Sequence, residues 1–297
     1  MPPAEHFATA PQWEWWILGY FVLGGISGGS YALATLIRFV GTGSDQAVSR
    51  LGYIASFIAL IPCPIFLTLD LGEPLRFWHM LVDTSEGGLA FKYWSPMSLG
   101  SWALTIFGLF SFVSFLGALA ATGWRPARSL SALGRGVFGS VWGAIGTFFG
   151  LFITGYTGVL LAVSNQVVWS DAGWALGGLF VASGLAGSAA LLLALAHWRR
   201  ADGPGTTARL EAADRSFALL EIVLLAVFVV SVAIAGTIGK VLGVWVLLWV
   251  VVLLGVVAPF VGSRLDTGRR WPRLTAPALA LAGLVALRAL VIFSAQT

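Results

Sequence analysis

The sequence alternates long apolar segments with short polar connections. Eight apolar segments are each close to the ~20 residues that a helix needs to cross ~30 Å of hydrocarbon. Their approximate bounds are 16–40, 52–69, 99–122, 137–163, 173–196, 217–239, 243–262 and 275–293. We therefore expect an all-α integral membrane protein with eight transmembrane helices, forming a single domain over residues 1–297. The polar connections 70–98 and 197–216 are expected to be loops. Residues 1–11 contain no Lys or Arg, so the first segment is not expected to be a cleaved signal peptide.

The basic residues predict the orientation of these helices. Thirteen arginines fall in or beside the connections after the first, third, fifth and seventh segments. They are Arg38, Arg50, Arg125, Arg128, Arg135, Arg199, Arg200, Arg209, Arg215, Arg264, Arg269, Arg270 and Arg273. The other side has only Arg76, Lys92 and Lys240, with Arg288 near the end of the last segment. Because basic loops stay in the cytoplasm, both termini are expected on the outer side of the membrane.

Glycine and proline predict how the segments pack and bend. In the first segment, Gly24/Gly28 and Gly25/Gly29 form two small-xxx-small pairs, which indicate close helix packing rather than ligand binding. Ile61-Pro62-Cys63-Pro64 in the second segment predicts a kink, because proline removes backbone donors. Ser95-Pro96 predicts the start of the third helix, with Ser95 as its N-cap.

One connection concentrates the polar chemistry of the chain. Residues 69–102 read LDLGEPLRFWHMLVDTSEGGLAFKYWSPMSLGSW. Charged side chains are dense here, whereas Asp, Glu, Lys and Arg make up only 10% of the whole chain. Gly72-Glu73-Pro74 predicts the end of the preceding helix. The connection is either a plain solvated loop or, because Arg76-Phe77-Trp78-His79 follows a carboxylate-rich helix end, a place to bind a polar ring at the membrane surface.

Composition excludes several kinds of site. Hydrophobic residues make up 58% of the chain. The mean hydropathy is +0.89, which is far from that of a soluble domain. A single cysteine, Cys63, cannot hold an iron–sulfur cluster. The three histidines, His6, His79 and His197, do not supply a facing pair at membrane depth, so no haem is expected. No phosphate-binding glycine loop is present, and no His/Glu cluster at helical spacing indicates a hydrolytic metal.

The remaining polar groups collect on the predicted outer side. Asp70 ends the second helix, Tyr156 lies in the outer half of the fourth, and Lys240 and Arg288 lie near outer helix ends. Ionisable groups inside a membrane usually mark function. Tyr, His, Asp and Glu beside Trp and Phe suit a quinone headgroup, which needs hydrogen-bond donors and two exchangeable protons. A transporter with an outer polar pocket, or a purely structural membrane anchor, is the alternative.

Three motifs carry a family resemblance. LDLGEPLRFWHML, SPMSLGSW and GYTGVLLAVSNQVVW resemble the NrfD-type membrane subunits, of which the membrane subunit of polysulfide reductase is the best known. The resemblance covers essentially the whole chain. It implies two four-helix bundles in the bacterial inner membrane and a haem-free site for menaquinone or ubiquinone. It also implies docking on the outer face to a four-cluster ferredoxin-like iron–sulfur subunit, which serves a catalytic subunit that is often a molybdopterin enzyme.

The resemblance also assigns site residues. Tyr156 matches the family's quinone-site tyrosine, and Thr157 follows it in the same motif. Asp70, Glu73, Arg76 and His79 match the end of the second helix and the loop after it. The first helix departs from the family pattern, since it offers Tyr20, Ser27, Ser30 and Tyr31 instead of an amide or imidazole. Glu221, expected ~8 Å inside the inner boundary at 1.5 Å per residue, is interpreted as a proton relay or as an anchor paired with Arg215.

Overall fold

The computed structural model describes residues 13–84, 87–124, 136–199, 201, 204–262 and 270–296. Arg125, Arg128, Arg135, Arg200, Arg264 and Arg269 lie outside the described residues, as does His6. The helices are α1 (Trp15–Val40), α2 (Gln46–Leu60), α3 (Pro62–Asp70), α4 (Pro96–Ala121), α5 (Gly136–Ala162), α6 (Trp169–Ala172), α7 (Ala175–Arg199), α8 (Pro204–Ile234), α9 (Ile238–Leu242), α10 (Val246–Gly262) and α11 (Arg270–Ser294).

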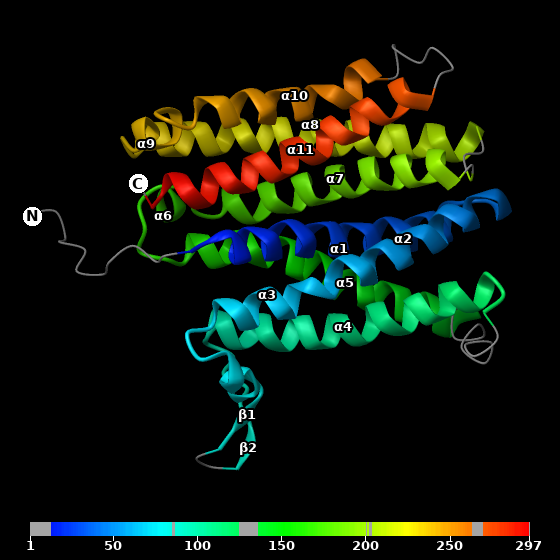
Figure 1. Ribbon diagram of the computed structural model, residues 1–297, viewed down its shortest axis with the longest axis horizontal. Coiled ribbons are helices and arrows are strands. Elements are labelled where there is room, and N and C mark those ends of the chain that lie inside the picture. Colours follow the sequence, from blue (N-terminus) through cyan, green and yellow to red (C-terminus); the bar gives the residue numbers. More distant parts are fainter. Residues whose placement is uncertain are drawn as a thin grey trace, which may run out of the picture.

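The long helices run roughly parallel to the longest axis of the molecule (Figure 1). Among the described residues, seven candidate spans are long and apolar enough to cross a membrane, counting α2 and α3 as one. The helix α10 is apolar but has only 17 residues. The all-α membrane architecture is therefore confirmed, while the count of eight spans stays a prediction.

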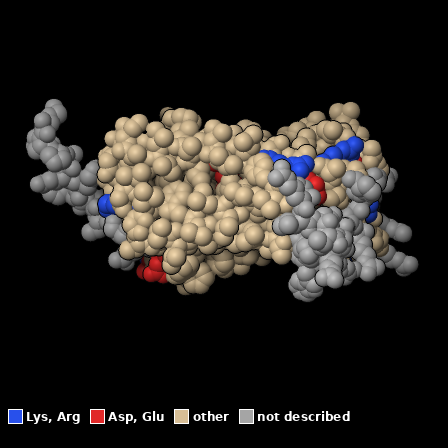
Figure 2. Space-filling model, turned by 90° about the horizontal axis from the view of Figure 1, so that it is seen from above, with Lys and Arg blue, Asp and Glu red and all other residues tan. Residues whose placement is uncertain are grey.

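The space-filling surface agrees with membrane burial. On the face shown in Figure 2, Lys, Arg, Asp and Glu atoms gather toward the two ends of the long axis, and a broad, almost uncharged band lies between them. Large apolar side chains are exposed along the helices, among them Phe148, Leu247 and Leu253. Such a surface is stable in lipid and would be an aggregation hazard in water.

The helices pack in two groups. The first group contains α1, α2, α3, α4 and α5, and the second contains α7, α8, α10 and α11; α1 and α5 join them by packing on α7. Glycines allow this contact: a Cβ on Gly28 would lie 2.1 Å from the Gly150 carbonyl oxygen of α5, and one on Gly29 would lie 2.7 Å from the Gly184 carbonyl oxygen of α7. The glycine pairs of the first segment are thus packing faces, as predicted.

Proline positions decide where the first helices break. A single residue, Ile61, separates α2 from α3, so the predicted kink at the Pro62 and Pro64 pair is confirmed. Ser95 caps α4, and its hydroxyl accepts the Ser98 backbone N–H at 3.4 Å. Between α3 and α4 lie the 3-10 helix η2 (Pro74–Met80) and a two-stranded hairpin, β1 (Val82–Asp83) and β2 (Gly88–Leu89).

The connection 197–216 differs from its prediction. It was expected to be a loop, but α7 continues to Arg199 and α8 begins at Pro204. Polar residues such as Arg209 and Asp214 obscured this extension, because only the apolar part of α8 resembles a membrane span. Glu221 consequently lies about 25 Å along α8 at 1.5 Å per residue rather than close to the helix start, and its depth in the membrane stays a prediction.

The first and last described residues, Trp13 and Gln296, lie at the same end of the molecule. The Trp13 backbone N–H donates to Gln296 Oε1 at 2.9 Å, and Gln296 Nε2 donates to the Trp13 carbonyl at 3.1 Å. The start of α1 and the end of α11 also lie at one end in Figure 1. Arg38, Arg50 and Arg199 lie in helix turns at the opposite end, so the predicted charge asymmetry separates the two ends of the structure.

Candidate functional site

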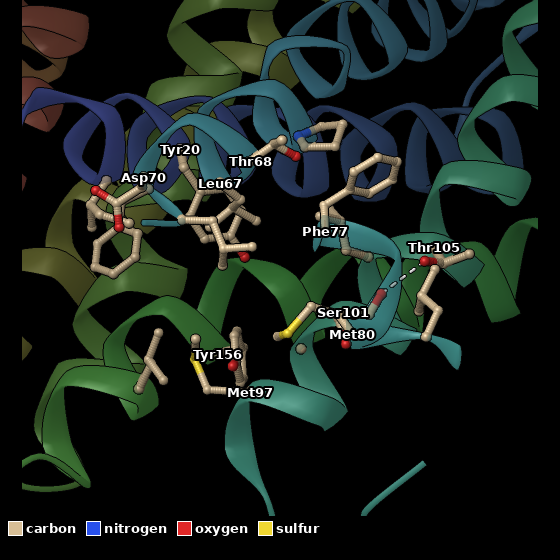
Figure 3. Close-up of a pocket in the computed structure, with 18 of the residues that line it drawn as sticks. Tyr20, Leu67, Thr68, Asp70, Phe77, Met80, Met97, Ser101, Thr105 and Tyr156 are labelled. Carbon is tan, nitrogen blue, oxygen red and sulfur yellow. Dashed lines mark hydrogen bonds between the residues drawn. The ribbon is translucent and has the colours of Figure 1, made fainter. Parts of the chain in front are cut away.

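A pocket opens among the helices of the first group, near the end where the chain termini meet. Its volume is about 210 Å³. It lies between α1, α3, α4 and α5, and residues of η2 and the segment after it cover one side (Figure 3). The residues around it are mostly apolar, and the polar ones are Tyr20, Thr68, Asp70, Ser101, Thr105 and Tyr156. An apolar pocket with a few convergent polar groups is typical of a small-molecule site.

The broken second span builds one wall of this pocket. The helix α3 restarts at Pro62, and its last two turns place Pro64, Leu67, Thr68 and Asp70 around the pocket. Gly72 and Pro74 then turn the chain into η2. This local sequence places a carboxylate, Asp70, half-buried at the end of a membrane helix.

Tyr156 forms the opposite wall and is held by α4. A Cβ on Gly100 would lie 2.4 Å from the Tyr156 hydroxyl oxygen, so only glycine allows the ring to lie this close to α4. The Tyr156 hydroxyl donates a hydrogen bond of 2.7 Å to the Pro96 carbonyl. Its hydrogen is therefore engaged, and its oxygen remains available as an acceptor. In this geometry Tyr156 can accept a hydrogen bond from a ligand hydroxyl.

Two other hydroxyls are available as donors. The Tyr20 side chain is 2% exposed, and among the described residues its hydroxyl makes no hydrogen bond with the protein. The same holds for the hydroxyl of Thr68. Ser101 and Thr105 instead donate to the Ser98 and Ser101 carbonyls, at 3.0 and 2.9 Å. Tyr20 and Thr68 thus supply the uncommitted donors of the pocket.

The structure places the predicted site residues in three different settings. Tyr156 and Asp70 line the pocket. Glu73, Arg76 and His79 are exposed and lie outside its lining, with the His79 ring 3.9 Å from the Trp78 ring between centroids. Thr157 is fully buried and donates to the Thr154 carbonyl at 3.0 Å, away from the pocket.

Glu221 lies in the second helix group, apart from the pocket. The basic side chain whose charge acts on it is Arg288 from α11, rather than the expected Arg215. Its surroundings are therefore described separately below.

Sequence reasoning gave no role to Thr68, Ser101 and Thr105, and it treated Tyr20 only as a departure from a family pattern. Ser101 and Thr105 are four residues apart in α4, so they share a helix face, and this spacing was a usable signal. Thr68 and Tyr20 had no such signal, because a single hydroxyl in an apolar helix does not show which neighbour it faces.

The fold and the pocket define a class: a polytopic helical membrane protein with a largely apolar pocket that hydroxyls and one carboxylate border. Within the described residues, no group of three or more His, Cys, Asp or Glu side chains lies close enough to hold a metal. Residues 4–297 match the family described as polysulphide reductase, NrfD. The chain belongs to this family.

One curated relative is a selenate reductase subunit of Mesobacillus selenatarsenatis. It is 30% identical over 96 residues, which are 32% of this chain and 20% of that protein. The match therefore covers a minor part of each protein, while the family match covers nearly the whole chain.

Proposed function

We propose that this protein is the quinone-binding membrane subunit of a respiratory oxidoreductase complex. The observation that carries the proposal is the pocket in the first helix group, where uncommitted hydroxyls of Tyr20 and Thr68 and the carboxylate of Asp70 meet apolar walls. Family membership supports it, because NrfD-type subunits interact with quinones. The relative named as a selenate reductase subunit supports a place in a reductase complex.

The residues present fit a quinone headgroup. Apolar side chains such as Ile17, Leu67 and Leu104 suit the ring and the start of its tail, and the hydroxyls suit its two oxygens. When bound, a quinone supplies two-electron, two-proton redox chemistry that the side chains of this chain lack. Tyr20 and Thr68 orient the headgroup by donating hydrogen bonds to it. The Tyr156 oxygen accepts a hydrogen bond from the quinol form of the ligand.

Asp70 supplies the carboxyl group on the pocket lining, so we propose that it exchanges protons with the headgroup. His79 follows on exposed η2 and is proposed as the next proton carrier toward outer water, because its ring nitrogens can accept and donate a proton. Arg76 and Glu73 are proposed to hold η2 in place. Thr157 is proposed to stabilise the turn of α5 that carries Tyr156, through its hydrogen bond to the Thr154 carbonyl. An external redox partner is required, and we propose an iron–sulfur subunit bound to the end that carries η2 and the hairpin.

Removing the Tyr20 hydroxyl tests the quinone site. Tyr20→Phe keeps the ring and breaks no hydrogen bond within the protein, so its thermal stability should stay unchanged. Losing a donor to the headgroup costs about 1–3 kcal/mol, or roughly five- to a hundredfold in quinone affinity. The measurement is quinone titration of the purified complex, with electron transfer from its partner subunits to an artificial dye as the assembly control.

Tyr31→Phe is the matched control, because the Tyr31 hydroxyl bonds Ser114 Oγ at 2.8 Å outside the pocket. It should leave quinone affinity unchanged. Equal quinone affinity in Tyr20→Phe and the wild-type complex would contradict the proposed site. If the protein is instead a transporter or a structural anchor, quinone titration should show no effect of either substitution.

A further inference from the structure

A second buried polar site lies in the second helix group, outside the quinone pocket. Its centre is the Glu221 carboxyl group in α8, which is 5% exposed and has no hydrogen-bond partner among the described residues. A small cavity of about 10 Å³ lies beside it, bounded by α7, α8, α10 and α11. This volume corresponds to about one water molecule.

A residue whose backbone carbonyl lacks its usual helical donor lines the same cavity. Pro259 lies inside α10 and lacks the N–H that a regular helix would direct at the Gly255 carbonyl four residues earlier. Both Gly255 and Pro259 border the cavity with Glu221. A Cβ on Gly255 would lie 2.6 Å from Gly283 Cα in α11, so the two backbones touch and no side chain fills the space. Glu221 and the Gly255 carbonyl are therefore two polar partners for one water.

The surrounding charges leave room for one proton. Asp214 and Arg288 are the ionisable groups that act on Glu221. Asp214 lies seven residues, about two turns, earlier on the same face of α8, and Arg288 lies on α11. The helix α10 has no ionisable residue, and α7 contributes Ala186 to the cavity. Asp214, Glu221 and Arg288 are the buried members, two carboxylates and one guanidinium, so one added proton makes these three groups neutral together.

Arg288 is held independently of this cavity. Its side chain is fully buried, and Nη2 donates to the Phe180 carbonyl at 3.1 Å and to Ser183 Oγ at 3.4 Å. Its guanidinium carbon lies 4.4 Å from the centroid of the Phe180 ring. No direct ion pair joins it to Glu221 in the part of the chain that the structure describes. The positive charge therefore stabilises the anionic state of the site without blocking the carboxyl oxygens.

We propose that Glu221, the Gly255 carbonyl and the cavity between them bind one water molecule and one exchangeable proton. When Glu221 is ionised, the water donates one hydrogen to its carboxylate and the other to the Gly255 carbonyl. When a hydronium ion from the aqueous phase gives up its proton, an O–H bond forms on Glu221. The carboxylic acid then donates to the water oxygen, and the water still donates to the Gly255 carbonyl. The site thus holds a proton without rearranging the helices.

Infrared difference spectroscopy on the purified protein tests this proposal by following protonated carboxylic acids as the pH is lowered. We expect a carboxylic acid band that shifts in D₂O and is lost in Glu221→Gln but kept in Asp214→Asn. Pro259→Ala restores an N–H to the Gly255 carbonyl and should shift the band, because it removes the acceptor of the water. Pro277→Ala, in α11 and away from the cavity lining, is the matched control and should leave the band unchanged.

The proposal would be overturned if the band assigned to Glu221 were still present in Glu221→Gln. It would also be overturned if the wild-type protein showed no such band at any pH at which the protein stays folded. Identical bands in Pro259→Ala and Pro277→Ala would overturn it as well. Quinone titration of the Glu221→Gln protein verifies its fold and should match wild type. The outcome is separate from that of the quinone proposal, since the two sites share no residue.

Discussion

Single glycines set the positions of functional side chains in this protein. Gly100 leaves room for the Tyr156 ring on α4, and Gly25 leaves room for the guanidinium of Arg288, whose Nη2 lies 2.5 Å from the place of a Cβ. The two cases differ in what a larger residue would displace. At Gly100 it meets a ring held by the hydrogen bond to Pro96, whereas at Gly25 it meets the end of a long side chain.

Gly100→Ala should move Tyr156 and distort the pocket. Overpacking of this kind costs about 1–3 kcal/mol, so we expect a lower unfolding temperature and weaker quinone binding than in wild type. Thermal unfolding in detergent and quinone titration measure the two effects. Gly108→Ala on the same helix is the control, because a Cβ there meets nothing within 4 Å. If both variants behave alike, the contact of Tyr156 with Gly100 does not shape the pocket.

At the scale of elements, a carboxylate ties the two helix groups together at the arginine-rich end. Asp45, in the 3-10 helix η1 (Gly43–Asp45), accepts hydrogen bonds from Thr206 Oγ1 and Arg209 Nη1 on α8. It also accepts the Thr42 backbone N–H at 2.6 Å. The pKa of Asp45 is lower than its ordinary value of 3.8. The largest cause is the hydrogen bond from the Thr206 hydroxyl, and the Thr42 N–H, the Thr42 hydroxyl and the charge of Arg209 add to it.

This lowered pKa predicts how stability depends on pH. A carboxylate with a lower pKa in the folded state stabilises it above the unfolded pKa and loses that contribution as the pH falls through the folded pKa. We expect the unfolding temperature to drop below about pH 4, and Asp45→Asn to be less stable at neutral pH with a smaller acid dependence. Glu14→Gln, at an exposed carboxylate before α1, is the control. Parallel pH curves for Asp45→Asn and wild type would contradict this role.

At the scale of the whole molecule, the two ends differ in chemistry. One end carries the described ends of the chain, the pocket, η2 and the hairpin, and the other carries Arg38, Arg50, Arg199 and the Asp45 cluster. Exposed aromatic residues, among them Phe91, Tyr93 and Trp94, lie at the first end. The positive-inside rule would place this end outside and the arginine-rich end in the cytoplasm.

Reporter fusions test that orientation. A fusion at Gly87, in the hairpin turn, should score outside the cytoplasm, whereas fusions at Gly205 and at Gly134, which lies outside the described residues, should score cytoplasmic. The contrast follows from the thirteen arginines predicted on the inner side. Activity of a cytoplasmic reporter at Gly87 would reverse the orientation and move the proposed partner to the other side of the membrane.

Features that depend on local chemistry could be predicted from the residues alone. Apolar length identified the membrane helices, Pro62 and Pro64 predicted the break in the second span, and Ser95 predicted the start of α4. Asp70 and Tyr156 were singled out because ionisable and polar side chains are costly in a membrane and therefore conspicuous. The start of α8 was missed, because its first turns are polar and a helix outside lipid needs no apolar run.

Which side chains contact one another across helices depends on the three-dimensional packing. Tyr20, Thr68 and Tyr156 come from three helices, and no spacing within one helix shows that their hydroxyls border one cavity. The hydrogen bond from Tyr156 to Pro96 likewise depends on how α5 packs against α4, and it leaves the Tyr156 oxygen as an acceptor. The cavity between Glu221 and the Gly255 carbonyl exists because α8 and α10 face each other, and helix packing is a property of surfaces that the linear order of residues does not specify.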